Sequence, residues 1–170
     1  MATRCRSVLV SILFTVFGGP GLVLVYLPLT MVRFGLPAGQ PLWQTIAAAI
    51  LILAGLTPLL ESIVRFVRVG RGTLMPAVPT EHLVVSGLYR YVRNPMYVGV
   101  LTVLVGETVL FNSRTMAIYA ATVFLGFYLF ILLYEEPTLR RRHGEDYLRY
   151  CKHVHRWWPR FRPYAGVPDP

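Results

Sequence analysis

The chain has 170 residues, of which 55% are hydrophobic, and it carries a formal net charge of +9. This composition is too apolar for an ordinary soluble domain. The length accommodates about four membrane crossings of roughly 20 residues each and excludes a large soluble domain beside them.

Four apolar segments predict an all-α integral membrane protein with about four transmembrane helices. The first segment is interrupted at Gly18–Gly21, so it is either one kinked crossing or a re-entrant hairpin; the charge distribution favours the kinked crossing. The four predicted transmembrane segments are Ser7–Val32, Trp43–Val64, Pro95–Asn112 and Thr115–Tyr134.

Two polar stretches complete the predicted single domain, 1–170. The loop 65–94 is long enough to be functional and is expected on the cytoplasmic side. After the last apolar segment, residues 135–160 predict a cytoplasmic helical cap, which Gly144 breaks into two short amphipathic helices lying along the membrane. Trp157 and Trp158 are placed as an interfacial aromatic anchor, and the tail beyond Pro159 is expected to be disordered.

The basic residues are distributed very unevenly. All of the 17 except Arg33 and Arg114 fall in the N-terminus, the loop 65–94 or the C-terminal tail. This asymmetry predicts an inner-membrane protein with both termini in the cytoplasm. It attracts anionic lipid headgroups and requires no nucleic-acid partner. Cys5 and Cys151 both fall on the reducing side, so no structural disulfide is expected.

Two helix ends carry the polar residues of interest. Asn94 is a favourable N-cap before Pro95, while Glu135 and Glu136 end the last apolar segment. A tight bend at 112–114 predicts an antiparallel hairpin, which brings both ends to one level. Carboxylates, helix N–H groups and tyrosine rings suit a small charged ligand. The alternative is that the two acids only pair with Arg140 at the surface.

Other candidate groups are isolated. Glu107 lies roughly 18 Å into its helix, where it forms either a structural hydrogen bond or part of a substrate pocket. Glu61 is expected to pair with Arg65 as an interfacial carboxylate. Cys151 and its histidine neighbours lack a second ligand cluster, so no metal site is predicted. The nucleotide-binding loops and hydrolase motifs are absent from the sequence.

Ordered motifs give the sequence a family resemblance. They read Ser86-Gly-Leu-Tyr89, Arg93-Asn-Pro-Met-Tyr97-x-Gly99, Glu135-Glu136-x-x-Leu139, His143-Gly-Glu-x-Tyr147-x-x-Tyr150 and Val154-x-Arg156-x-x-Pro159. Over roughly half the chain, the sequence resembles the isoprenylcysteine carboxyl methyltransferase and phospholipid methyltransferase superfamily of integral-membrane enzymes.

The resemblance implies S-adenosylmethionine as cosubstrate, with no metal. It also implies methyl transfer to a lipid-like acceptor, either isoprenylcysteine-carboxylate-like or a phospholipid amine, at the cytoplasmic membrane face. The cofactor-binding residues carried over by the motifs would be Glu81, His82, Leu83, Val84, Tyr89, Asn94, Pro95, Met96, Tyr97 and Glu135.

The chain departs from the family pattern at two positions. Asn94 stands where members commonly have histidine, and it retains the ability to donate and accept hydrogen bonds. Ile131 stands where prenylcysteine-specific members have an arginine, which argues against a prenylcysteine carboxylate. An amine acceptor would require a proton acceptor, for which Glu136 and Glu107 are the candidates.

Two other functions fit parts of the sequence. A non-catalytic transporter or scaffold would explain the helix break at Gly18–Gly21 and the intramembrane Glu107. A sterol-reductase-like enzyme with a nicotinamide cofactor is a third, weaker interpretation. The sequence leaves open the identity of the acceptor, its nucleophilic atom and the oligomeric state.

Overall fold

The computed structural model describes residues 19–32, 39–68 and 83–166. These residues form helices and connecting turns without any β-strand, which confirms the predicted all-α class. The choice between a kinked span and a hairpin for the first apolar segment depends on residues 1–18, which lie outside the described part of the chain.

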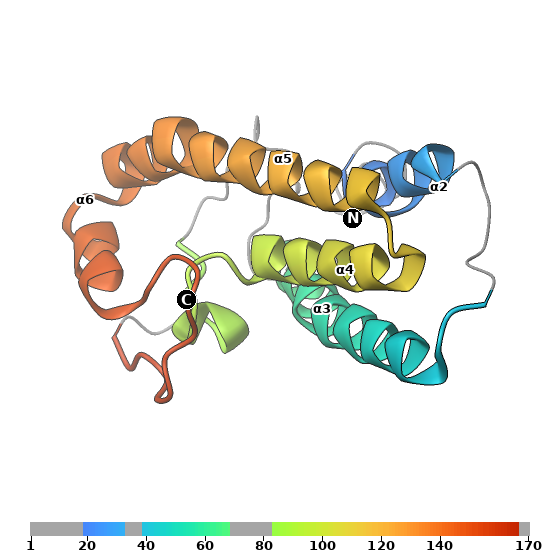
Figure 1. The fold of residues 1–170 in the computed structure, drawn as a ribbon. Coiled ribbons are helices and arrows are strands. Elements are labelled where there is room, and N and C mark those ends of the chain that lie inside the picture. The colour runs from blue at the N-terminus through green and yellow to red at the C-terminus, as the bar shows by residue number, and fades with distance from the viewer. Residues whose placement is uncertain (1–18, 33–38, 69–82, 167–170) are drawn as a thin grey trace, which may run out of the picture.

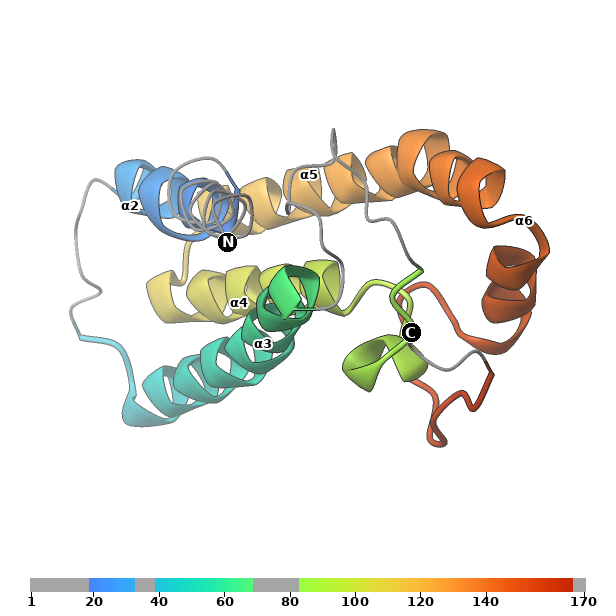
Figure 2. The same cartoon turned by 180° about the vertical axis from the view of Figure 1, so that it is seen from behind.

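Three helices form the centre of the molecule, with α4 lying between α3 and α5 (Figure 1). The view from behind shows the short α2 against α5, close to the end where α5 begins (Figure 2). In chain order the elements are η2 (Leu22–Tyr26), α2 (Leu27–Met31), α3 (Leu42–Arg68), η3 (Gly87–Arg90), α4 (Pro95–Phe111), α5 (Arg114–Phe130), η4 (Ile131–Glu135) and α6 (Glu136–His153).

Among the described residues, two helices are long and apolar enough to cross a membrane. They are Leu42–Arg65 in α3 and the helical run Arg114–His153, which consists of α5, η4 and α6. The helices Leu22–Met31 and Pro95–Phe111 are apolar but shorter. With 17 residues, α4 extends for about 26 Å, slightly less than the hydrocarbon thickness of about 30 Å. Two of the four predicted crossings therefore have helices of spanning length, and the other two stay predictions.

Glycines allow α3 and α4 to approach closely. A Cβ atom on Gly55 would lie 2.6 Å from the Gly99 carbonyl oxygen, and one on Gly99 would lie 2.7 Å from that of Gly55. Small residues are the usual means of bringing two helices together in lipid, where the hydrophobic effect does not drive association. Beside this contact, Leu59, Val103 and Leu104 belong to the main buried cluster.

The turn between α4 and α5 is short, as the sequence predicts. Asn112 takes the left-handed conformation, with φ +46°, at the end of α4. The Ser113 side chain then accepts a hydrogen bond from the Met116 amide at 3.4 Å and caps α5. The predicted antiparallel hairpin is confirmed, and it places the start of α4 beside the end of η4.

The C-terminal part of the chain folds back over the segment that precedes α4. Helix α6 breaks at Gly144, the residue at which the sequence places the interruption, with φ +51°. Its second half contributes Tyr147 and Tyr150 to a buried cluster with Val85 and Val154. The tail after α6 then runs along residues 90–93, to which it is joined by three backbone hydrogen bonds: Arg93 N–H to His155 O at 2.9 Å, Arg160 N–H to Tyr91 O at 2.9 Å and Tyr164 N–H to Arg90 O at 3.0 Å.

Candidate functional site

The ends of α4 and η4 meet through two of the expected residues. The Tyr97 hydroxyl donates a hydrogen bond to Glu135 Oε2 at 2.9 Å. The Tyr97 ring packs against Phe127 of α5, with centroids 4.7 Å apart. The hairpin predicted from the sequence therefore brings this tyrosine and this carboxylate into direct contact.

Glu135 is presented by a turn of π-helix. The segment η4 closes this turn immediately before Glu136, and Pro137 follows. Proline lacks an N–H and its ring collides with the carbonyl four residues earlier in an α-helix, so a wider turn relieves the clash. Single π-turns occur often at functional sites. The local sequence thus accounts for the irregular backbone at this carboxylate.

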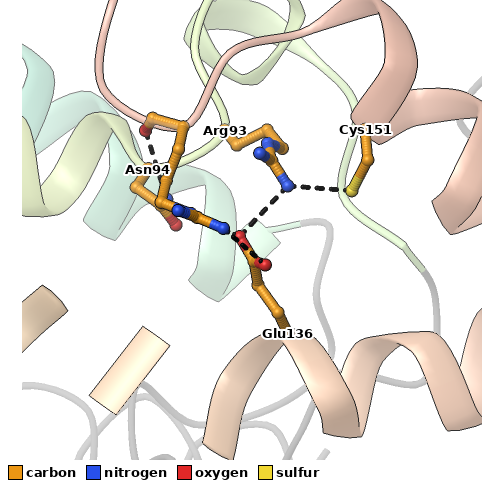
Figure 3. A network of polar contacts seen from close by, with 5 residues as sticks. Arg93, Asn94, Glu136 and Cys151 are labelled. Carbon is orange, nitrogen blue, oxygen red and sulfur yellow. Dashed lines mark hydrogen bonds and ion pairs between the residues drawn. The ribbon is translucent and has the colours of Figure 1, made fainter. Parts of the chain in front are cut away.

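The adjacent Glu136 lies in a network of positive charges (Figure 3). Arg156 binds it with two bonds, Nε to Oε1 at 2.7 Å and Nη2 to Oε2 at 2.8 Å. Arg93 adds a bond from Nη1 to Oε1 at 3.1 Å. The hydrogen bond with Glu136 raises the pKa of Arg156 above its ordinary value, so the guanidinium stays charged. These partners replace Arg140, the surface partner considered from the sequence.

Arg93 also connects the network to α6, because its Nη1 donates to Cys151 Sγ at 2.9 Å (Figure 3). Sequence reasoning did not assign a role to Arg93 or to Arg156. The available signal was their place in the family motifs, Arg93 directly before Asn94 and Arg156 in Val154-x-Arg156-x-x-Pro159. Through their bonds to Glu136 and Cys151, Arg93 and Arg156 hold α6 and the tail against the start of α4.

Asn94 occupies the N-cap position of α4 but does not cap the helix with its side chain. Its Nδ2 instead donates to the Arg156 carbonyl at 3.2 Å, and the residue is buried. The N-cap role expected for this side chain is therefore wrong. The reason is that the Arg156 carbonyl binds the Asn94 amide nitrogen and so holds the side chain in an orientation that does not cap the first helical turn.

Tyr89 forms another side of the site. It is buried, and burial raises the pKa of its hydroxyl well above the usual value, so it stays neutral. Its hydroxyl interacts with Ser62 of α3 and lies near enough to Glu135 for an electrostatic effect. The Tyr150 hydroxyl donates to the Tyr89 carbonyl at 2.6 Å and fixes the turn η3 under α6.

The other residues expected in the site are distributed around these. Val84 and Pro95 are buried, Leu83 packs against the cluster under α6, and Met96 packs against the main core. Glu81 and His82 lie outside the described residues.

Two acids have separate environments. Glu107 lies twelve residues after Pro95 on α4, roughly 18 Å from the helix start, and the fold does not bring it together with Glu136. Glu61 forms the expected ion pair with Arg65. No group of three or more potential metal ligands occurs among the described residues.

The described residues thus form a helical fold with two helices of membrane-spanning length, and a carboxylate and tyrosine rings lie at helix ends under a cap formed by α6 and the tail. The family model for phospholipid methyltransferases matches residues 43–146. Because this match covers more than half of the chain, the protein belongs to the phospholipid methyltransferase family.

This family lies within the superfamily of integral-membrane methyltransferases that the sequence motifs resemble, so the resemblance is confirmed. No curated protein and no solved structure shows significant similarity to the chain. The family membership supports a methyltransferase that acts on lipid-like substrates.

Proposed function

We propose that the protein transfers a methyl group from S-adenosylmethionine to a lipid-like acceptor at the cytoplasmic face of the membrane. The observation that carries this proposal is the contact between Tyr97 and Glu135 at adjoining helix ends. The family membership supports the reaction class and the lipid nature of the acceptor.

The described residues fit the chemical groups of this methyl donor. S-adenosylmethionine supplies an electrophilic methyl carbon on a sulfonium cation, and it also carries an ammonium group and a ribose diol. The Glu135 carboxylate is suited to the ammonium or the diol, and the faces of Tyr89 and Tyr97 are suited to a cation. The overlying tail and α6 would limit access of water, and positioning would supply most of the rate enhancement.

We assign Glu136 a positioning role, because its two carboxylate oxygens are bonded to Arg93 and Arg156. A carboxylate held by two guanidinium groups is a poor proton acceptor. For Glu107 to accept a proton, the nucleophile would have to lie roughly 18 Å from the start of α4. Neither acid therefore has a favourable position to receive the proton of an amine acceptor, so we propose that the amine loses this proton to solvent at the cytoplasmic face before it attacks the methyl group.

For the acceptor, we favour a phospholipid amine over a prenylcysteine carboxylate. Ile131 is completely buried at the position where prenylcysteine-specific members would have an arginine. This part of the chain therefore offers no cation to a substrate carboxylate. We further propose that both termini face the cytoplasm, since the topology predicted from the sequence assigns most of the basic residues to that side of the membrane.

Binding of S-adenosylmethionine to the purified protein in detergent tests the site. Glu135→Ala is expected to weaken the affinity at least tenfold, because it removes the carboxylate and leaves the Tyr97 hydroxyl unpaired. The matched control is Asp146→Asn, which removes an exposed carboxylate of α6 paired with Arg149. Equal affinities of the two variants would contradict the site assignment. Extraction of lipids after incubation with isotopically labelled methyl donor would then identify the acceptor.

A further inference from the structure

An apolar groove with a volume of about 450 Å³ lies along one face of α4. Its floor is the part of α4 between Val98 and Val105, and its sides are formed by Leu51 of α3 and Phe124 of α5. The volume is in the range of small-molecule sites, which are commonly 300 to 1,000 Å³. The seven helical steps from Val98 to Val105 give the floor a length of about 10 Å.

The groove has an almost completely apolar lining. The only hydroxyl on its floor belongs to Thr102, and this group already donates to the Val98 carbonyl at 2.8 Å. The surface that remains is suited to a hydrocarbon chain. No charged side chain takes part in the lining.

One end of the groove is formed by the tail rather than by a membrane helix. Trp157 and Trp158 both contribute to the lining, and the Trp157 ring packs on Phe124 with centroids 5.4 Å apart. The Trp157 indole Nε1 is buried and has no hydrogen-bond partner among the described residues. Buried donors in proteins are usually satisfied, so this N–H is available for an oxygen of a bound molecule.

The groove adjoins the proposed site of methyl transfer at two points. Arg156, which holds Glu136, immediately precedes Trp157 in the chain. Phe127, which packs on Tyr97, lies one helical turn from Phe124. A molecule at the end of the groove formed by Trp157 would therefore lie next to Glu136 and Tyr97.

We propose that this groove binds a hydrocarbon chain of the lipid acceptor, and that the Trp157 indole N–H donates to an oxygen of the acceptor's linker or headgroup. The inference rests on the proposed function and adds a binding site to it. The tail supplies Trp157 and Trp158 to the groove, so binding of the acceptor chain is linked to the contacts that hold the tail, among them those of Arg156 with Glu136.

Fluorescence quenching by a phosphatidylethanolamine with brominated chains tests the groove directly. The protein would carry Trp43→Phe, so that Trp157 and Trp158 report alone, and the lipid would be titrated in detergent micelles. We expect saturable quenching. Thr102→Phe, which fills the floor, should weaken the apparent affinity at least fivefold. Its matched control is Leu125→Phe, at an exposed α5 residue that does not line the groove, and it should bind like the parent.

A second variant separates filling of the groove from loss of the donor. Trp157→Phe retains an aromatic ring and removes the N–H, and it should weaken binding about three- to tenfold, with Trp158 as the reporter. Equal quenching of Thr102→Phe and Leu125→Phe, or quenching that never saturates, would show that only bulk lipid reaches the tryptophans and would overturn the proposal.

Binding of S-adenosylmethionine, measured on the same preparations, keeps the two proposals distinguishable. The groove variants should bind the methyl donor like the parent. A parent protein that does not bind the donor would contradict the proposed function, whereas the lipid titration alone decides the groove.

Discussion

Two adjacent acids have different partners because successive residues of a helix point in different directions. Glu135 faces Tyr97, which offers one neutral hydroxyl. Glu136 faces Arg93 and Arg156, which offer three charged hydrogen bonds. The first carboxylate retains capacity to bind a further ligand, while the second is committed to holding the tail. Glu135 and Glu136 are therefore neighbours in sequence with two separate roles.

We expect Glu136→Gln to destabilise the protein. The substitution leaves the guanidinium groups of Arg93 and Arg156 without a counter-charge in a largely buried position, which costs about 3 kcal/mol. The midpoint of thermal unfolding in detergent should fall by roughly 6–12 °C. Asp146→Asn, which breaks an exposed pair, should change the stability by less than about 1 kcal/mol. Similar midpoints for the two variants would argue against the role given to Glu136.

Tyr97→Phe is expected to affect ligand binding more than folding. It removes one hydrogen bond to Glu135, worth about 1 kcal/mol, and keeps the ring that packs on Phe127. Without this hydroxyl, the carboxylate is no longer held in place for the methyl donor. Calorimetric titration with S-adenosylmethionine should show an affinity reduced about fivefold or more. Thermal unfolding of the same sample measures any loss of stability.

Between helices, the sequence predicted some contacts and could not predict others. The tight bend at 112–114 predicted the α4–α5 hairpin, because a connection of two residues forces neighbouring antiparallel helices. The glycine contact between Gly55 and Gly99 was not predicted. Glycines 44 positions apart carry no local pattern that identifies them as partners, and their proximity appears only when the helices are packed.

Gly99→Leu should disrupt the packing of α3 against α4. Even a Cβ at this position would lie 2.7 Å from a backbone oxygen of Gly55, and backbone atoms cannot move aside as a flexible side chain can. The expected cost is about 2–3 kcal/mol from overpacking. Gly126→Ala is the control, since a Cβ there meets nothing within 4 Å, and better helix propensity should stabilise α5 by up to about 1 kcal/mol. Thermal unfolding of both variants in one detergent gives the comparison.

For the molecule as a whole, the tail completes both the cap and the apolar groove. The sequence predicted the break at Gly144 and interfacial tryptophans, but the disorder predicted beyond Pro159 is wrong, because Arg160 and Tyr164 bind the backbone of residues 90–93. Backbone hydrogen bonds to residues 90–93 leave no trace in side-chain patterns, so this return of the chain could not be predicted. The polar residues Asn94 and Arg156 were visible in the motifs, while their mutual contact was not.

Truncation after His153 would test the tail as a structural part of the site. The shortened chain lacks Arg156, so Glu136 retains only Arg93, and it lacks the carbonyl that Asn94 binds. The helices α3, α4 and α5 keep their mutual contacts, and far-UV circular dichroism should show nearly unchanged helicity. Affinity for S-adenosylmethionine should fall more than tenfold.

A chain ending at Tyr164 provides the matched comparison, because it retains the three backbone hydrogen bonds of the tail. It should bind the methyl donor like the full-length protein. Full binding by the chain that ends at His153 would show that α4 and η4 form the site without the tail. This result would contradict the proposed dependence of the site on the tail. Weak binding by both truncated chains would place the requirement beyond residue 164, rather than in the contacts of Arg156 and Asn94.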